Sequence, residues 1–291
     1  MTQGLVVALG ERLFRVDRPW GNLPATSGHV TDVAVDSQGR VFVLLRYDPL
    51  GHSAGPAIVV LAPDGRRISA WGDGLIADAH MLAIAPDDGV YLVDRDGHQV
   101  VRCTPEGDPI SVLGGRNAAL RPFNHPCDVA FGPGGDIYVA DGYGNSLVHR
   151  FTSEGVLIRS FGRRGVNDAE FLCPHGVWVT PDGLVIVADR DNNRLQRFTA
   201  AGEWLDILPG FTKPMDVWGD DDGRIYVTDQ GPTLSLLAPD GRFLGCCRPV
   251  LKGAHGVAGD SARGVLYLAE DAPSRVTRLT EIRPEARSTS F

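Results

Sequence analysis

The sequence predicts an all-β fold, a six-bladed β-propeller, and three observations support this. Short β-branched runs such as residues 184–188 alternate with Asp-Gly, Gly-Gly and Asn-Asn turns along the chain. One strand–turn–strand unit recurs six times, at a period of roughly 40 to 50 residues, which is the range of four-stranded propeller blades. The pattern covers nearly the whole chain without a boundary. We therefore expect one domain over residues 1–291.

The elements follow in a regular order. The six copies begin with first strands at residues 30–34, 79–83, 126–130, 174–178, 214–218 and 254–258, and continue into second strands at 41–45, 90–94, 137–141, 184–188, 225–229 and 265–269. The first copy carries the longest insertion, residues 46–56, between its second and third strands. Residues 281–291 are polar, and we expect them to form a loose tail.

The N-terminal segment has strand character, at residues 5–9 and 13–16, but precedes the first full copy. Residues 11–15 resemble the outer part of a blade, the part that residues 194–198 supply in the fourth copy. The sixth copy, by contrast, ends soon after residue 279. We therefore expect the N-terminal segment to complete the sixth blade and close the ring, which removes open sheet edges.

The net charge and the lack of long apolar segments argue against two classes of partner, nucleic acids and membranes. A formal net charge of −8 argues against nucleic acid or an anionic membrane as a partner. No apolar stretch approaches the length that spans a bilayer, and no secretory signal is visible at the N-terminus. The five cysteines have no framework spacing and are interpreted as free thiols, so we expect a cytoplasmic protein.

One column of the aligned first strands alternates between histidine and other residues. In blade order its members are Thr31, His80, Cys127, His175, Met215 and His255. The second, fourth and sixth blades are related by about a third of a turn in a six-bladed ring. Because the innermost strands line the centre of the ring, these three imidazoles are expected to converge on one point.

Three converging imidazoles are the protein ligands of an open metal site, with one position left for water or substrate. A single histidine on an inner strand is more often a packed core residue. Here three of the eight histidines occupy one column on alternate blades. We therefore predict a metal ion bound by His80, His175 and His255. Zinc suits three histidines best, and the ligand type also admits iron, cobalt or manganese.

A second column lies at the end of the second strands, at the end of the ring where the insertion is expected. Its members are Arg46, Arg95, Gly142, Arg190, Gln230 and Asp271. Arginines there can bind a carboxylate through a bidentate fork, whereas Arg95 is interpreted as a solvated turn residue. Tyr143 is one residue further on. Its phenol is a poor base at its ordinary pKa near 10, but a nearby metal ion or arginine would stabilise the phenolate.

These residues resemble those of a known family. The copies resemble NHL-type repeats, and the set resembles the peptidyl-α-hydroxyglycine amidating lyases, most strongly over residues 123–198. In that family three propeller histidines bind zinc, and the three column histidines stand at the matching positions. The family's catalytic tyrosine lies in an Asp-Gly-Tyr-x-Asn-Ser motif, matched here by residues 141–146 with Tyr143. Its two site arginines match Arg46 and Arg190.

The sequence departs from this family in two places. The family follows its third histidine with an aspartate implicated in a structural calcium site, and Gly256 stands here instead. Calcium is therefore not expected in the family's manner, although a backbone carbonyl could still ligate an ion. The family's paired cysteines fall on Asn124 and Gly144, and on Ile186 and Arg197, so neither disulfide can form. This agrees with a cytoplasmic protein.

Together, the residues and the resemblance predict a zinc-dependent lyase that cleaves the C–N bond of an N-(α-hydroxyalkyl) amide, giving an amide and an aldehyde or glyoxylate. Tyr143 is the expected general base. Arg46 and Arg190 are expected to orient a small-molecule or peptide-derived amide substrate. Two other classes stay open: a metal-dependent hydrolase, such as a lactonase, that uses the same site, and a non-catalytic interaction propeller.

Overall fold

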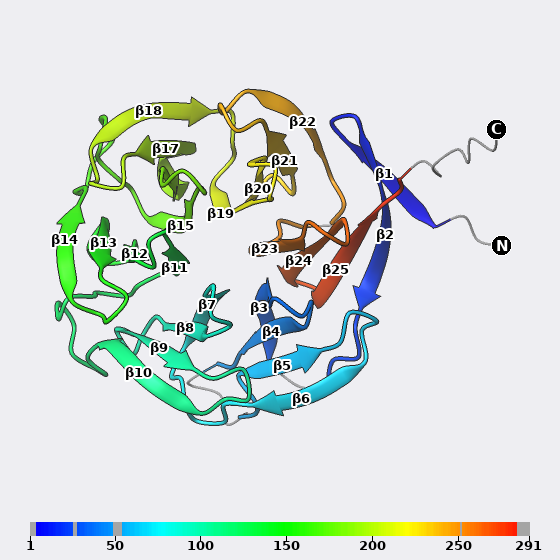
Figure 1. Cartoon of the computed structure of the whole chain (residues 1–291), viewed down its shortest axis with the longest axis horizontal. Helices are drawn as coiled ribbons and strands as arrows, with labels where there is room; N and C mark the ends of the chain where they lie inside the picture. Colours follow the sequence, from blue (N-terminus) through cyan, green and yellow to red (C-terminus); the bar gives the residue numbers. More distant parts are fainter. Residues whose placement is uncertain (1–3, 26–27, 49–53, 251, 284–291) are drawn as a thin grey trace.

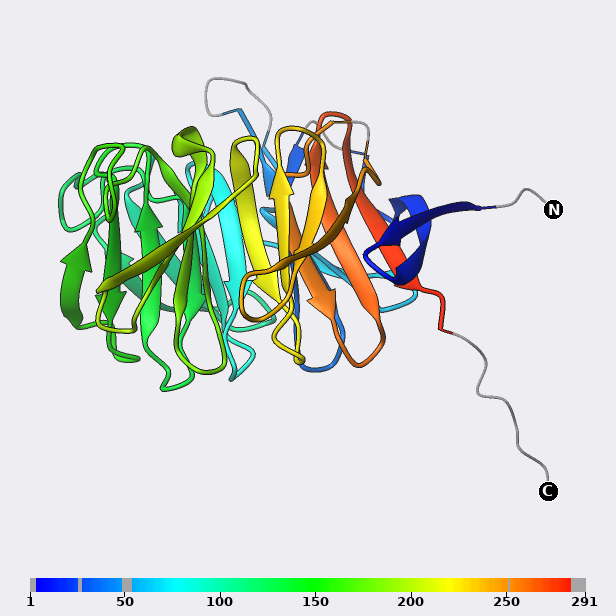
Figure 2. The same ribbon diagram turned by 90° about the horizontal axis from the view of Figure 1, so that it is seen from above.

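The computed structural model describes residues 4–25, 28–48, 54–250 and 252–283. Within these ranges six sheets are arranged as blades around a common centre, as predicted (Figure 1). Seen from its edge, the ring is a short disc in which the strands run between its two faces (Figure 2). A single turn of 3-10 helix, η1 (Arg190–Asn192), is the one helical element in the described ranges.

The first five blades are four-stranded antiparallel sheets whose strands follow chain order from the centre outward. Blade 1 contains β3 (His29–Val35), β4 (Val41–Arg46), β5 (Ile58–Leu61) and β6 (Arg67–Trp71). Blade 2 contains β7 (Ala79–Ile84), β8 (Val90–Asp94), β9 (Gln99–Cys103) and β10 (Pro109–Gly114). Blade 3 contains β11 (Asp128–Phe131), β12 (Ile137–Asp141), β13 (Leu147–Phe151) and β14 (Leu157–Phe161). Blade 4 contains β15 (Pro174–Val179), β16 (Val185–Asp189), β17 (Arg194–Phe198) and β18 (Trp204–Pro209). Blade 5 contains β19 (Pro214–Gly219), β20 (Ile225–Asp229), β21 (Leu234–Leu237) and β22 (Phe243–Cys247).

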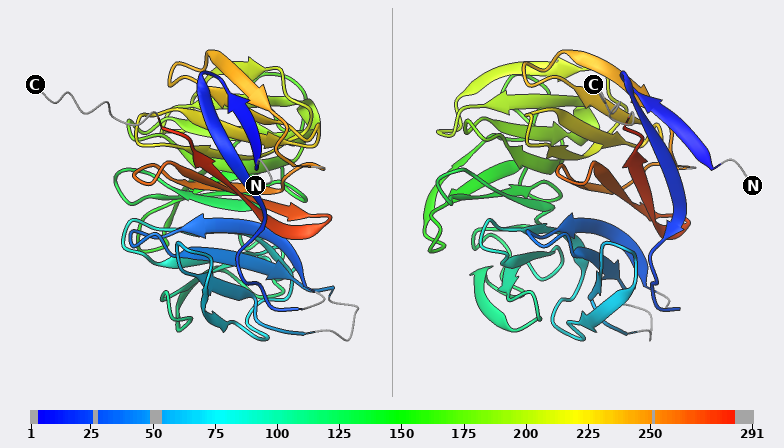
Figure 3. Two further views of the ribbon diagram at one scale, coloured as in Figure 1. Left: turned by 90° about the vertical axis from the view of Figure 1, so that its right-hand side faces the viewer. Right: turned by 45° about the vertical axis from the view of Figure 1, so that its right-hand side comes forward.

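The sixth blade joins the two ends of the chain. Its order from the centre is β23 (Gly256–Asp260), β24 (Val265–Asp271), β25 (Ser274–Glu281), β2 (Arg12–Trp20) and β1 (Leu5–Leu9). The N-terminal segment therefore closes the ring, as predicted, and β1 adds a fifth strand outside it (Figure 3). The expected equivalence of residues 11–15 to residues 194–198 is wrong: β25 already supplies the third strand by pairing with β24, so β2 pairs with the other edge of β25 and takes the fourth place.

The apolar second strands are buried between neighbouring blades, and β16 illustrates why they are continuously apolar. Val185 and Val187 pack in the cluster shared with blade 3, whereas Ile186 and Ala188 pack in the cluster shared with blade 5. Alternate side chains thus face opposite neighbours, so both faces of the strand are dry. Burying each such valine or isoleucine stabilises the fold by roughly 1.5–3 kcal/mol.

The remaining predictions on organisation have mixed outcomes. The insertion of the first copy lies between β4 and β5, as predicted, although residues 49–53 are outside the described part. Of the predicted tail, Glu281 ends β25 and residues 284–291 are also outside it. All five cysteines are free thiols. Among the described residues there is no helix long and apolar enough to cross a membrane.

Candidate active site

β-Bulges bring the histidine column to the centre of the ring. The pairing of β15 with β16 shifts between Pro174 and Gly176, which leaves His175 as the extra residue of the bulge. The pairing of β7 with β8 shifts in the same way around His80. Such bulges re-aim a side chain out of the ordinary strand alternation. The third histidine, His255, directly precedes β23, and its N–H donates to the carbonyl of Ala269 at 2.8 Å.

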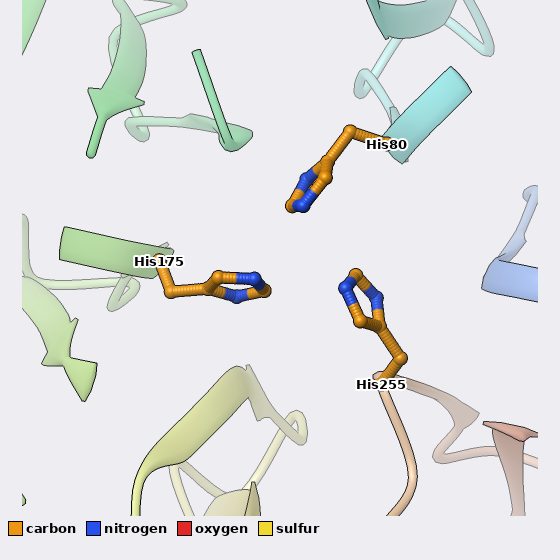
Figure 4. Close-up of side chains that lie close together, drawn as sticks. All are labelled: His80, His175 and His255. Carbon is orange, nitrogen blue, oxygen red and sulfur yellow. The ribbon is translucent and has the colours of Figure 1, made fainter. Parts of the chain in front are cut away.

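The three imidazoles form a nearly equilateral triangle (Figure 4). Their ring centroids are 4.9 Å apart for His80 and His175, and 5.0 Å apart for each of these with His255. One nitrogen from each ring lies within 4.8 Å of the others. The three imidazoles therefore converge as predicted, and their nitrogens could hold one metal ion between them.

Each imidazole is held in one tautomer by the neighbouring blade. Because a carbonyl oxygen can only accept, the Nδ1 atom must carry the proton, and the lone pair of Nε2 is left for a ligand. The acceptor is always the non-histidine member of the same column in the next blade. The bonds run from His80 to Cys127 at 2.7 Å, from His175 to Met215 at 2.8 Å, and from His255 to Thr31 at 2.9 Å. The donor set, three neutral imidazoles with fixed second nitrogens, fits Zn²⁺.

Three buried carboxylates, which the sequence interpretation missed, fasten the histidine-bearing strands. Asp32, Asp128 and Asp216 follow the non-histidine members of the column in blades 1, 3 and 5. Each accepts the N–H of the residue two positions after a histidine in the next blade, at 2.8 Å. The donors are Leu82, Val177 and Val257. The recurring Asp-Val pair on alternate blades was the signal in the sequence.

The phenol of Tyr143 lies directly beside the histidines. Its oxygen is 3.1 Å from Nε2 of His80 and 3.3 Å from Nε2 of His175, and it accepts a hydrogen bond of 3.1 Å from Nη1 of Arg190. Burial raises the pKa of Tyr143, and the guanidinium of Arg190 opposes that rise. Arg190 thus favours the phenolate, as expected, while burial of the phenol works in the opposite direction.

The three arginines of the second column have different surroundings. Arg190 lies beside Tyr143 and is paired through Nε with Asp191 at 3.1 Å. Arg46 is held by Asp78, a buried carboxylate that it contacts through both Nε and Nη2. Arg95 shares the same carboxylate, at 2.6 Å. The structure thus places Arg46 in an ion-paired cluster, and Asp78 is a further residue that the sequence interpretation missed.

Arg95 is not the solvated turn residue that the sequence suggested. Its guanidinium lies 5.2 Å from the ring centroid of Tyr143, and the guanidinium of Arg190 lies at the same distance. Blades 2 and 4 flank blade 3, so the equivalent arginines of both blades reach the tyrosine between them. Two cations near one aromatic ring stabilise negative charge on its oxygen.

The position of Gly256 bears on calcium. A Cβ atom at this glycine would collide with Oδ1 of Asp32, so an aspartate cannot be accommodated there unless Asp32 moves. Both oxygens of Asp32 already accept backbone N–H groups, from Val33 and Leu82 at 2.8 Å each. Burial and the neighbouring carboxylate of Asp216 raise the pKa of Asp32 well above its ordinary value. A carboxylate is thus present near the family's position, but it comes from blade 1.

Comparison with known proteins identifies the repeat. Residues 123–151 and 171–198 match the NHL repeat model. This chain is an NHL-repeat propeller. It is 30% identical to human NHL repeat-containing protein 3 over 248 residues, which is 80% of this chain and 66% of the human protein. It is also 29% identical to Peptidyl-alpha-hydroxyglycine alpha-amidating lyase 1 of Drosophila melanogaster over 206 residues, 60% of this chain and 38% of that protein.

Solved structures agree on the fold of this NHL-repeat propeller. A gluconolactonase from Xanthomonas campestris matches with a TM-score of 0.68 and 17% identity, covering 94% of this chain and 91% of the other. Virginiamycin B lyase from Staphylococcus aureus matches with a TM-score of 0.65 and 18% identity, covering 94% and 90%. At such identities the likeness concerns the fold alone. The chain spans about two thirds of human NHL repeat-containing protein 3 and much less of the amidating enzymes.

The histidines of the propeller are expected to resist protonation when no metal is bound. Burial lowers the pKa of His80 and His175 well below 6.5, and repulsion between the imidazoles is the next largest cause. Burial lowers the pKa of His255 to about 4. We expect NMR titration of the chelator-treated protein to give a midpoint near 4 for His255. A midpoint near 6.5, the value of an exposed imidazole, would contradict the buried, single-tautomer site.

The directions of these pKa shifts determine whether folding stability rises or falls with pH. A histidine with a depressed pKa contributes stability that is present above pH 6.5 and is lost as the pH falls through about 4. Asp216 has the opposite sign, because burial raises its pKa to about 7. Its contribution is present below about pH 3.8 and is lost as the pH rises through 7. The two groups offset one another between pH 4 and 6.5, so the titration of individual groups is the informative measurement.

Proposed function

We propose that this NHL-repeat propeller is a zinc-dependent lyase that cleaves the C–N bond of an N-(α-hydroxyalkyl) amide. The observation that supports it is the position of the Tyr143 oxygen, within 3.3 Å of two imidazole nitrogens and 3.1 Å of the Arg190 guanidinium. Two of the candidate metal ligands and the cation of Arg190 therefore lie within hydrogen-bonding distance of the candidate base Tyr143. Similarity to the Drosophila amidating lyase supports the reaction class.

His80, His175 and His255 would hold the metal ion through Nε2. Zinc at such a site supplies a Lewis acid that lowers the pKa of a ligated hydroxyl group. With both nearby Nε2 atoms occupied, the Tyr143 hydroxyl would lose its two nearest acceptors and could give up its proton. Arg190, together with the charge of a bound ion, would favour the resulting phenolate.

The reaction moves one proton from oxygen to nitrogen. Tyr143 takes the proton of the substrate hydroxyl, the O–H electron pair forms the carbonyl bond, and the C–N bond breaks with its electron pair on the amide nitrogen. That nitrogen then takes a proton, so no water and no redox partner is consumed. Because the Tyr143 phenolate becomes a neutral phenol in the first step, it can return that proton to the departing amide nitrogen in the second. The products are an amide and an aldehyde, or glyoxylate when the substrate carries a carboxylate.

The substrate's carboxylate or carbonyl is proposed to face Arg190 rather than Arg46. Both arginines make a two-point contact with a carboxylate, but Asp78 beside Arg46 is fully buried, whereas Asp191 beside Arg190 is 38% exposed. Arg190 also turns Nη1 toward Tyr143. A charged hydrogen bond is worth about 1.5–3 kcal/mol, or roughly 10- to 150-fold in binding. Arg190→Ala is therefore expected to raise KM about that much and also to lower kcat, because the phenolate loses its nearest cation.

Arg197→Ala provides a matched control for steady-state kinetics of the arginine variant. This residue makes a comparable ion pair, with Asp206 at 2.6 Å, but between β17 and β18 on the outside of blade 4. Such pairs are worth at most about 1 kcal/mol to stability and are remote from the site. KM should be unchanged in this control. Equal effects of the two variants on KM would remove Arg190 from substrate binding.

The proposed reaction is tested with α-hydroxyhippurate, a carbinolamide that carries a carboxylate. The zinc-loaded protein is expected to release benzamide and glyoxylate in equal amounts, identified by mass spectrometry. A hydrolase acting at the amide carbonyl would release benzoate instead, with the elements of water added. Benzoate as the product, or no turnover of any carbinolamide in a panel of small acyl groups, would overturn the lyase assignment.

A further inference from the structure

The outer strand of the sixth blade, β1, differs from the outer strands of the other five blades. In each of those blades the outer strand carries one extra residue opposite its neighbour, a β-bulge. The extra residues are Ile68, Ile110, Ile158, Leu205 and Leu244. β1 pairs with β2 without any such shift, from Leu5 opposite Val16 to Leu9 opposite Arg12. Because bulges twist a sheet edge away from other chains, the edge of β1 lacks a protection that the other five edges have.

β1 also lacks the charged residues and prolines that guard exposed edges. All residues of Leu5–Leu9 are apolar, and the side chains of Leu5 and Val6 are 44% and 47% exposed. Ala8 is exposed as well. Figure 1 shows β1 at the rim of the ring, outside β2. A regular, uncharged and exposed edge strand is a template on which a further strand can pair.

The backbone groups that face the open edge belong to Val6 and Ala8. Residues 10–11 form a two-residue turn between β1 and β2, so the flanking pair, Leu9 and Arg12, is a hydrogen-bonded pair. Bonded pairs alternate along an antiparallel ladder, so every second residue of β1 before Leu9 also bonds to β2. The N–H and C=O groups of Val6 and Ala8 therefore point away from β2. Within the described part of the chain, no residue makes a hydrogen bond to these four groups.

An exposed apolar row extends from this edge across the sheet. Ala8 of β1 lies opposite Leu13 of β2, and the N–H of Ile282 donates to the carbonyl of Leu13 at 2.8 Å. Leu13 is 47% exposed and Ile282 is 46% exposed. Side chains directly opposite one another on neighbouring strands lie on the same face of a sheet, and so do residues two apart on one strand. Val6, Ala8, Leu13 and Ile282 therefore form one apolar surface beside the open edge.

We propose that this edge and the apolar surface beside it are an interface between two copies of the protein, in which the two β1 strands pair antiparallel about a two-fold axis at Val7. Val6 of each copy then lies opposite Ala8 of the other, and the two pairs make four backbone hydrogen bonds. No like charges meet along the paired strands, because β1 has no charged residue. A separate peptide bound to β1 would leave its own outer edge open, whereas two copies leave neither edge open. The interface lies outside blade 6, so it does not depend on the proposed lyase function.

The interface is tested by placing a charge on the edge. Light scattering during size-exclusion chromatography should give the wild-type protein twice the mass of one chain as its concentration is raised. Val6→Lys should raise the dissociation constant of the dimer by more than about tenfold, because a lysine from each copy would enter an apolar pairing edge. A wild-type protein that has the mass of one chain at every concentration would overturn the proposal.

Ile110→Lys is the matched control. Ile110 is 51% exposed and is the bulged residue of β10, the outer strand of blade 2. The substitution adds the same charge to an outer strand, so the dissociation constant of the dimer should stay at the wild-type value. Thermal denaturation shows whether both variants keep the fold. If Ile110→Lys dissociates the dimer as strongly as Val6→Lys does, the contact between the copies is not at β1.

The register of the pairing is tested by cross-linking with diamide, which oxidises two thiols to a disulfide. A two-fold axis at Val7 places the two copies of this residue directly opposite one another as a non-hydrogen-bonded pair, the closest pairing in a sheet. Val7→Cys should therefore give a covalent dimer on non-reducing electrophoresis, in greater yield than the wild type with its own free cysteines. Ala8→Cys, which faces Val6 of the other copy, should cross-link no better than the wild type. No gain in Val7→Cys, or an equal yield in Ala8→Cys, would overturn the two-fold pairing.

Discussion

Replacing His175 with alanine is expected to abolish carbinolamide cleavage and to release the metal ion. His175 supplies one of three nitrogens whose rings form a triangle with sides of about 5 Å, and two imidazoles cannot complete that ligand set. Loss of a partner that merely orients a ligand lowers metal affinity by roughly 10- to 100-fold, so loss of the ligand itself should exceed that range. Zinc affinity by competition with a chelator, and glyoxylate release, measure the two effects.

Met215→Leu is the control for the histidine variant. Met215 belongs to the same column in the next blade, and its carbonyl accepts the Nδ1 proton of His175 at 2.8 Å. Leucine has nearly the same volume and keeps the backbone carbonyl, so zinc affinity should stay at the wild-type value. Wild-type zinc affinity in His175→Ala would show that the triangle is a packed histidine cluster and not a metal centre.

Replacing Tyr143 with phenylalanine is expected to slow turnover by roughly a hundred- to ten-thousandfold, the range for a positioned general base. The substitution removes one oxygen and keeps the ring that lies between Arg95 and Arg190. The fold and the zinc content should therefore be preserved. Steady-state kinetics with α-hydroxyhippurate, together with circular dichroism, measures the effect on turnover and on the fold.

A second tyrosine provides the control for this variant. Tyr91 in β8 is buried and packs against Phe131, with ring centroids 4.7 Å apart, away from the histidines. Tyr91→Phe should leave turnover within a factor of two or so, because its hydroxyl takes no part in the chemistry. Unchanged glyoxylate release in Tyr143→Phe would exclude this phenol as the base, whatever the metal content.

The repeat made the fold and the histidine triangle predictable from sequence. In a propeller, equal spacing along the chain becomes equal rotation around the axis, so a column of histidines on alternate blades must converge. The column alone therefore predicts that His80, His175 and His255 meet at the centre. The strand positions could be predicted equally well from the sequence, because each blade repeats a short apolar run between two turns.

Side-chain contacts between neighbouring blades could not be predicted from the repeat. Asp128 binds the N–H of Val177 in the next blade, 49 residues away, and Asp78 joins Arg46 to Arg95 across two blades. Their partners depend on where side chains of neighbouring blades meet, which no spacing within one copy reports. The place of β2 was missed for a related reason, since pairing of β2 with β25 links residues more than 250 positions apart.

Arg95 shows how a local interpretation fails at a site. By itself its position after Asp94 looks like an ordinary solvated turn. In the ring, blades 2 and 4 both face blade 3, which places Arg95 and Arg190 at equal distances from the Tyr143 ring. Comparing equivalent positions across neighbouring blades would have identified Arg95 as a site residue.

The metal content of the purified protein tests the central claim most directly. Elemental analysis of protein from zinc-supplied cells is expected to give one zinc ion per chain, held by His80, His175 and His255, and a variant with all three replaced by alanine should contain none. Zinc-free wild-type protein, or one zinc ion per chain retained in the triple variant, would contradict the account.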